Sequence, residues 1–153
     1  MYKTILLAYD GSLGGRRALR EGANVAIKFN AATHLLAVMR PAFGAQIGHG
    51  FDTGHMTDTE LKHYQSTLDE GVEMLKGWGL DAEGHLVRGD PVGEISRLAG
   101  EVAADLVVVG HGTHGALARW WRTPLSASLL DRLNCSLLIA MHGEATDEII
   151  GRE

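Results

Sequence analysis

A glycine-rich stretch in the second half of the sequence has the residue types of an anion-binding loop. Residues 106–126 read LVVVGHGTHGALARWWRTPLS, so a buried strand is expected to lead through a loop into a helix. Glycines allow backbone N–H groups to approach a ligand, and a helix start adds unpaired N–H donors and the positive end of the helix dipole. The stretch therefore predicts a site for a phosphate or another anion.

The elements that must position this loop alternate between strands and helices. Continuous apolar runs predict strands over residues 3–9, 32–39, 82–88, 106–109 and 136–141. Amphipathic spacing predicts helices over about residues 16–29, 58–77, 92–102 and 124–133, and Thr57 with Glu60 forms a capping box at the second. The expected apolar faces are Ala18, Gly22, Val25, Ala26 and Phe29 on the first helix, Leu61, Tyr64, Leu68, Val72 and Leu75 on the second, and Val92, Ile95, Ala99 and Val102 on the third.

This alternation favours an α/β fold, in which helices cover both faces of a parallel sheet. Ligands of such sheets bind beyond the carboxyl ends of the strands. Polar, glycine-bearing loops follow three predicted strands, over residues 10–15, 89–90 and 110–115, whereas the helix-to-strand connections lack such clusters. A site at the carboxyl end of the sheet is therefore expected.

Composition narrows the classes of protein. The 153 residues suit one domain, expected over residues 1–141, with a polar tail over 142–153. The net charge of −5 argues against a nucleic-acid partner, because affinity for phosphate backbones comes from clustered Lys and Arg. No apolar run reaches the roughly 18 residues of a membrane span, so no membrane association is expected. The single cysteine, Cys135, allows no intrachain disulfide and suits a cytoplasmic location.

Several segments together resemble the universal stress protein family over nearly the whole chain. They are ILLAYDGS at residues 5–12 followed by RRALREG, LLAVMRP closing the second strand, VRGDP at residues 87–91, DLVVVGHGTHG, and NCS at residues 134–136. Their order and spacing carry the resemblance, since each segment alone is weakly specific. The resemblance implies a flavodoxin-like (adenine-nucleotide alpha hydrolase-like) three-layer sandwich with a five-stranded parallel sheet in the order 3-2-1-4-5.

The resemblance also implies a site for ATP or another adenine nucleotide. The candidate nucleotide-binding residues are Ala8, Asp10, Gly11, Ser12, Val38, Gly89, Asp90, Val109, Gly110, Gly112, Thr113, Thr123, Leu125 and Ser126. In ATP-binding members the loop after strand four has glycine, two residues, glycine, nine residues, then glycine and Ser or Thr. In an ungapped alignment Gly110 matches the first glycine, Thr113 replaces the second, and Thr123-Pro124 replaces the closing pair.

These departures weaken the expected phosphate contacts. Thr123 adds a β-branched side chain where a phosphate would lie against bare backbone, and as an N-cap it would compete for a helix-start donor. Pro124 lacks an N–H altogether. Thr113, Ser126 and nearby arginines offer partial compensation. The adenine positions Asp10 and Val38 are retained, so adenine contacts are expected to survive better than phosphate contacts.

Each candidate has a structural alternative. Asp10 could cap the turn formed with Gly11 and Ser12 instead of binding a ligand, and Gly89-Asp90 could form a simple turn before Pro91. The eight histidines include His111 and His114 in the loop, but their spacings match no tight ligand motif. No resident metal and no catalytic residue are therefore expected.

The last strand predicts a homodimer. In the implied strand order it lies at a sheet edge, which must be covered or paired. The candidate edge residues are Leu137, Leu138, Ile139, Ala140 and Met141. The leading hypothesis is a small dimeric stress-response binding or signalling module with weak or absent ATP binding. Two alternatives remain: an ATP- or AMP-binding sensor that slowly hydrolyses ATP, and a ligand-free scaffold whose 41–57 loop and Trp120-Trp121 pair bind a protein partner.

Overall fold

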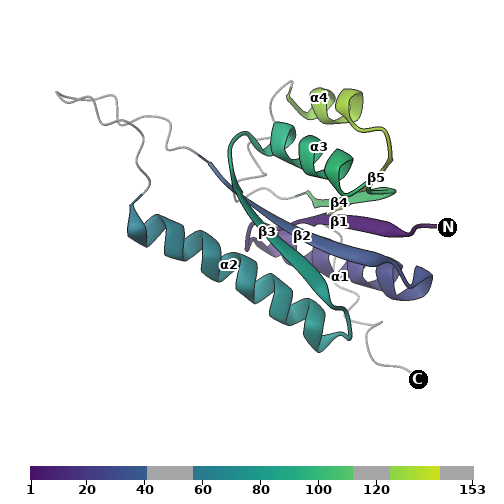
Figure 1. The fold of residues 1–153 in the computed structure, drawn as a ribbon, viewed down its shortest axis with the longest axis horizontal. Coiled ribbons are helices and arrows are strands. Elements are labelled where there is room, and N and C mark those ends of the chain that lie inside the picture. The colour runs from purple at the N-terminus through teal and green to yellow at the C-terminus, as the bar shows by residue number, and fades with distance from the viewer. Residues whose placement is uncertain (41–56, 112–124, 142–153) are drawn as a thin grey trace.

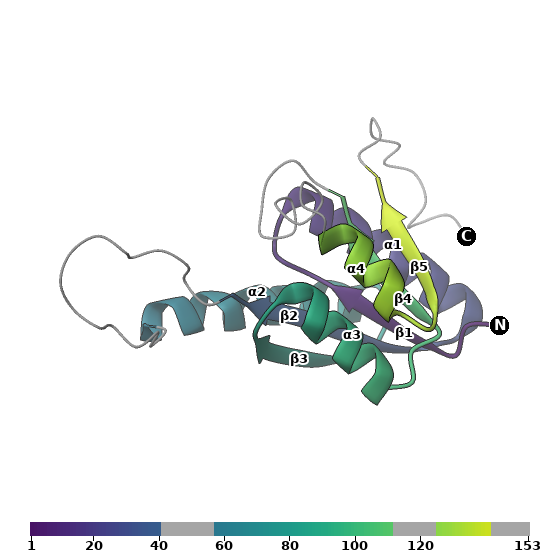
Figure 2. The same ribbon diagram turned by 90° about the horizontal axis from the view of Figure 1, so that it is seen from above.

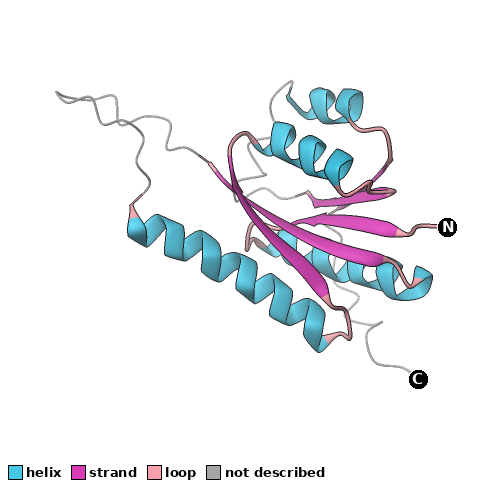
Figure 3. Cartoon of the chain, viewed as in Figure 1, coloured by secondary structure: helices cyan, strands magenta, loops and turns pink. Residues whose placement is uncertain are grey.

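The computed structural model describes residues 1–40, 57–111 and 125–141, without the side chains of residues 125–128. Strands and helices alternate along the whole described chain (Figure 3). The elements are β1 (Thr4–Ala8), α1 (Leu13–Phe29), β2 (Ala32–Met39), α2 (Asp58–Gly77), β3 (Ala82–Arg88), α3 (Pro91–Glu101), β4 (Leu106–Gly110), α4 (Leu125–Arg132) and β5 (Ser136–Ala140).

The strands form one parallel sheet in the order β3-β2-β1-β4-β5, which confirms the predicted flavodoxin-like topology. In the register of the central strands, Leu7 of β1 lies between Leu35 of β2 and Val108 of β4. Figure 1 shows α1 and α2 on one face of the sheet and α3 and α4 on the other, and Figure 2 shows the same layers from above. The three layers therefore match the predicted sandwich.

Alternate residues of each strand serve two separate cores. Leu7 of β1 packs on the α1 and α2 side, with Leu19 and Leu75. Leu6, the preceding residue, packs on the other side with Ile95 and Leu129, from α3 and α4. This follows from the period of two in a strand, and it explains why the strands are apolar runs instead of alternating patterns.

Two predicted helix faces need correction. Leu61 of α2 is 45% exposed, because α2 spans about 30 Å and its first turn extends past the residues that contact the sheet. The buried residues of α2 begin at Thr67. Phe29, the last residue of α1, is 37% exposed and contacts Tyr2 edge-on at the periphery. The inward face of α1 instead includes Leu19 and Ala23.

Some predicted boundaries also differ. Gly14-Gly15 was expected to precede the first helix, but both glycines lie inside α1, because Ser12 is its N-cap. The capping box of Thr57 and Glu60 is present at α2 as predicted. β1 and β5 each end one residue early, at Ala8 and Ala140. Within the described ranges no helix is long and apolar enough to span a membrane.

Candidate functional site

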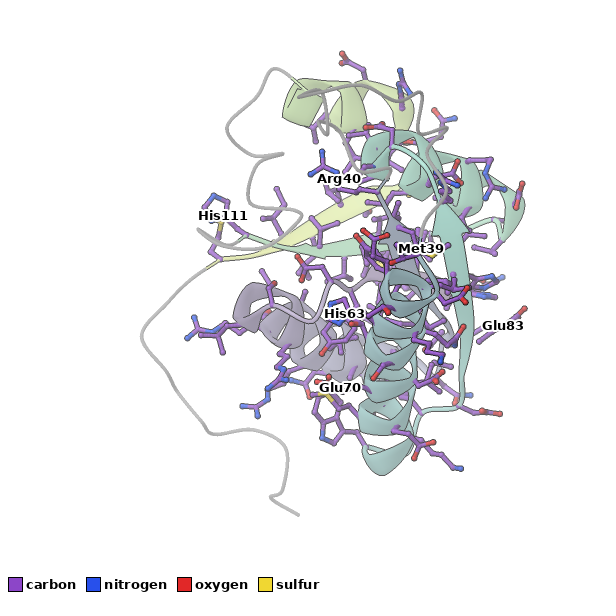
Figure 4. The ribbon with its side chains drawn as sticks, turned by 90° about the vertical axis from the view of Figure 1, so that its left-hand side faces the viewer. Met39, Arg40, His63, Glu70, Glu83 and His111 are labelled. Carbon is purple, nitrogen blue, oxygen red and sulfur yellow. The ribbon has the colours of Figure 1, made fainter. Side chains whose placement is uncertain are left out.

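A small, mainly apolar pocket lies at the carboxyl ends of β1 and β2, between α2 and α3. Figure 4 views the molecule from this end, where Met39 ends β2, Arg40 follows it, and His111 follows β4. The pocket is lined by Ala8, Tyr9, Asp10, Leu36, Ala37, Val38, Tyr64, Thr67, Pro91 and Ile95. Three of the sequence-predicted residues, Ala8, Asp10 and Val38, are thus brought together. Carbon walls with a carboxylate and three hydroxyl-bearing side chains suit a flat apolar ring that has a few polar edges.

Asp10 forms the turn that begins α1. Its Oδ1 accepts a hydrogen bond from the backbone N–H of Ser12 at 2.9 Å and a second from the Ser12 hydroxyl. The Ser12 Oγ in turn accepts from the backbone N–H of Gly15 at 3.0 Å, as an N-cap does. Gly11 has φ +78°, which glycine adopts without strain. Asp10 therefore has the structural role in the turn that was expected as the alternative to ligand binding. Its side chain also lies at the wall of the pocket.

Gly110, the retained first glycine of the loop, lies directly against the start of α1. A Cβ built on Gly110 would be 2.3 Å from the carbonyl oxygen of Gly14 and 3.0 Å from the nitrogen of Gly15. No real Cβ tolerates the first distance. Backbone packing therefore requires glycine here, whatever the loop binds. The preceding residue, Val109, is fully buried in the α3 and α4 core and does not line the pocket.

Gly89 and Asp90 form the connection from β3 to α3. The Gly89 N–H donates to the carbonyl oxygen of Met39 at 3.0 Å, which ties the ends of β3 and β2 together. Asp90 is the N-cap of α3, and its Oδ2 accepts from the backbone N–H of Gly93 at 2.9 Å. The predicted Gly-Asp-Pro turn is thus observed, with Pro91 at the first turn of the helix. Pro91 itself contributes to the pocket.

The remaining predicted residues form no described part of the pocket. Gly112, Thr113 and Thr123, and with them Trp120 and Trp121, lie outside the described residues. Leu125 and Ser126 lie in the first turn of α4, without described side chains. The phosphate end of the predicted site therefore stays a prediction.

A polar group that the sequence analysis missed supports the pocket from the α2 side. The buried Tyr9 donates its hydroxyl to Oε1 of Glu70 at 2.9 Å, and Arg16 donates to the same oxygen at 2.8 Å. Burial is the main cause that raises the pKa of Tyr9 above 10.0, and the Glu70 charge adds to it. These contacts join β1, α1 and α2. Sequence separation hides them, since Tyr9 and Glu70 are 61 residues apart.

A second group missed from sequence lies on β2 and β3. The Nδ1 of His34 and the Nε2 of His85 are 3.1 Å apart, and Glu83 lies beside both imidazoles. Burial is the first cause of the lowered pKa of His34, and the nearby His85 is the second, while Glu83 opposes them. The Glu-x-His spacing of residues 83–85 was a usable signal, because alternate strand residues share a face.

The sheet order and the carboxyl-end pocket define a flavodoxin-like α/β domain. A sequence model of the universal stress protein family matches residues 1–140. The chain therefore belongs to the universal stress protein family.

Individual relatives agree with this assignment. A universal stress protein of Methanocaldococcus jannaschii is 23% identical over 141 residues, which cover 91% of this chain and 82% of that protein. The crystal structure of a universal stress protein in complex with cAMP is 28% identical, with a TM-score of 0.65 over 90% of this chain and 96% of that one. A universal stress protein from Archaeoglobus fulgidus in complex with dAMP shares the fold at 21% identity, with a TM-score of 0.65 over 90% and 97%.

Proposed function

We propose that this protein is a small cytoplasmic binding module that holds the base and ribose of an adenine nucleotide and supports a triphosphate poorly. The observation that carries the proposal is the pocket in which Ala8 and Val38 meet the carboxylate of Asp10. An adenine ring needs apolar walls, and a nearby carboxylate suits a hydroxyl or amino donor. The 28%-identical relative was crystallised with cAMP, a nucleotide that has a single phosphate.

The weak support for a triphosphate follows from the loop after β4. Gly110 is needed for packing against Gly14, so its retention is no argument for phosphate binding. Thr123-Pro124 replaces the closing glycine and Ser or Thr of ATP-binding members and removes one backbone donor. We therefore expect AMP or cAMP to bind at least as tightly as ATP, although each added phosphate normally offers further contacts.

A ligand titration tests this function. Heat-denatured protein is examined for released nucleotide by mass spectrometry, and the nucleotide-free protein is titrated by calorimetry with AMP, cAMP and ATP. The expected result is binding of a monophosphate with ATP equal or weaker. ATP released in equal amount to protein, or bound more tightly than both monophosphates, would refute the damaged-loop proposal. Absence of binding by all three would favour the ligand-free scaffold.

A matched pair of variants locates the binding. Val38 lines the pocket, and Val87 pairs with it in register on β3 without lining the pocket. Both side chains are half-buried and pack in the same core. Val38→Trp is expected to block nucleotide binding. Val87→Trp is the control for the loss of stability that an added indole causes on the same face of the sheet. Equal affinities in the two variants would place any nucleotide elsewhere.

We further propose a homodimer that pairs through β5. Among the described strands β5 has only β4 as a neighbour, so its outer row of backbone N–H and C=O groups faces no other strand of this sheet. Leu137, Leu138 and Ile139 are half-buried and Met141 is 61% exposed. A second copy of the chain would cover this apolar edge.

A further inference from the structure

We propose that His34, Glu83 and His85 form a binding site for a zinc-like divalent transition metal on the β2–β3 edge of the sheet. The ligand atoms of these three side chains all lie within 4.8 Å of one another. The individual separations are 3.1 Å between His34 Nδ1 and His85 Nε2, 3.6 Å between His34 Nδ1 and Glu83 Oε2, and 4.0 Å between His85 Nε2 and Glu83 Oε1.

Strand register creates this cluster. His34 is directly opposite Glu83, and Leu36 is opposite His85, in the parallel pairing of β2 with β3. Glu83 and His85 are two residues apart on one strand, so their side chains leave the same face. The two imidazoles therefore approach each other from neighbouring strands, offset by two residues along the strand direction. The backbone hydrogen bonds between β2 and β3 fix the positions of both strands. Such preorganisation lowers the cost of bringing ligands together.

The distances match the geometry that zinc requires. Zinc ligands at about 2.0–2.1 Å from the metal, arranged as a tetrahedron, lie about 3.3–3.4 Å from one another. The three observed separations bracket this value. The two imidazole side chains are only 15% and 20% exposed, whereas the Glu83 side chain is 70% exposed and projects from β3 toward solvent (Figure 4). A rotamer change of Glu83 alone would shorten the two longer separations.

The chemistry of the donor set selects the class of metal. Two imidazoles and one carboxylate suit Zn²⁺, Cu²⁺ or Ni²⁺, whereas Mg²⁺ and Ca²⁺ prefer oxygen ligands throughout. Without metal, one of the facing nitrogens must carry the proton of the 3.1 Å hydrogen bond. On metal binding that proton moves to the other nitrogen of the same ring, and both facing lone pairs bind the ion. Three protein ligands leave a fourth position for water.

This site is separate from the nucleotide pocket. His34 and Val38 are four residues apart on β2, a distance of roughly 13 Å along an extended strand. Neither histidine lines the pocket, although Leu36, which is opposite His85 in the register, does. Metal binding can therefore be measured on nucleotide-free protein, and it stands or fails independently of the proposed function.

Cobalt provides the probe, because Co²⁺ in a tetrahedral protein site absorbs visible light far more strongly than octahedral aqueous Co²⁺. Tag-free protein is titrated with Co²⁺ and then with Zn²⁺. The expected result is one equivalent of tetrahedral Co²⁺ that Zn²⁺ displaces. Long-range ¹⁵N NMR with Zn²⁺ is expected to show metal on His34 Nδ1 and His85 Nε2. Absence of the tetrahedral spectrum, or of these imidazole shifts, overturns the proposal.

Variants assign the ligands. Glu83→Gln and His85→Gln are each expected to weaken Zn²⁺ binding at least about ten-fold, since loss of an outer-shell partner alone produces such an effect. His63→Gln is the matched control, because His63 lies on α2 outside the cluster and is exposed (Figure 4). The exposed position of Glu83 makes Glu83→Gln safe for folding, and circular dichroism checks both variants. Unchanged affinity in either variant, or an equal loss in His63→Gln, overturns the three-ligand site.

Discussion

The hydroxyl of Tyr9 donates to Oε1 of Glu70 at 2.9 Å and so joins the end of β1 to the middle of α2. Tyr9 is 2% exposed and lines the pocket at the carboxyl end of the sheet, to which α2 contributes Tyr64 and Thr67. The hydrogen bond therefore fixes the position of one pocket wall relative to the sheet.

Tyr9→Phe is expected to lower the free energy of unfolding by about 1 kcal/mol at neutral pH, because a hydrogen bond to a carboxylate is lost. The folded-state pKa of Tyr9 is raised above 10.0, so the native protein holds this proton more tightly than the unfolded chain. Stability of the wild type should therefore fall as the pH rises above 10, and Tyr9→Phe should lack this component. Urea unfolding at neutral and alkaline pH measures the difference in free energy of unfolding between the two proteins. This difference should become smaller as the pH rises. A difference that grows with pH would contradict the stabilising role given to the hydrogen bond of Tyr9.

Gly110→Ala is expected to destabilise the fold by about 2 kcal/mol or more, since the new methyl group would overlap the Gly14 carbonyl oxygen and the backbone must move. Gly100→Ala is the control. Gly100 lies in α3, where an added Cβ has nothing within 4 Å, and alanine there should stabilise by up to about 1 kcal/mol. Urea denaturation of both variants measures these changes in the free energy of unfolding. Equal stabilities would mean that the Gly110–Gly14 contact is not rigid.

Two substitutions of Asp10 distinguish its structural role in the turn from its proposed role in ligand binding. Asp10→Asn keeps a side-chain oxygen that can accept from Ser12, so stability should change little. Asp10→Ala removes both hydrogen bonds of the turn and should cost roughly 1 kcal/mol. Both variants should bind AMP more weakly if the carboxylate contacts the nucleotide. Calorimetric titration beside thermal unfolding gives the two readouts, and wild-type affinity in Asp10→Asn would leave Asp10 only its structural role.

Met141→Glu is expected to shift the protein from dimer to monomer, because it places a charge at the apolar β5 edge. Met141 is 61% exposed, so the fold should tolerate the change. Leu61→Glu serves as the control at a 45% exposed position on α2. Analytical ultracentrifugation at micromolar concentration measures both. A wild-type monomer, or a dimer that survives Met141→Glu, would remove β5 as the interface.

The alternation of apolar runs and amphipathic segments was enough to predict a parallel α/β sheet and the end at which the pocket lies, because each strand and helix carries its own local signal. The strand order came only from the resemblance to the family. The pocket residues Ala8, Asp10 and Val38 follow from that topology and the family resemblance. The His34–His85 pair could not be found in this way, since their approach depends on the register between β2 and β3. The same holds for Tyr9 and Glu70, where a strand residue meets a helix residue distant in sequence.

The predicted apolar faces of the helices were wrong at positions where tertiary packing determines which residues are buried. A periodic pattern extends to Leu61, but whether a turn is covered depends on how far the sheet reaches beneath it. Gly14 and Gly15 resemble loop residues in the sequence, yet the Ser12 cap places them in α1. A Cβ on Gly15 would lie 2.6 Å from Oδ1 of Asp10, so the turn that begins α1 leaves no room for a larger residue there.

The contact between Gly110 and Gly14 has a consequence for the classification of relatives. A glycine at the end of the fourth strand is a requirement of the scaffold in this chain, so its presence has little diagnostic value for ATP binding. Under the proposed function, the pair of residues that occupies the place of Thr123-Pro124 is instead the feature expected to separate triphosphate binders from other members of the family.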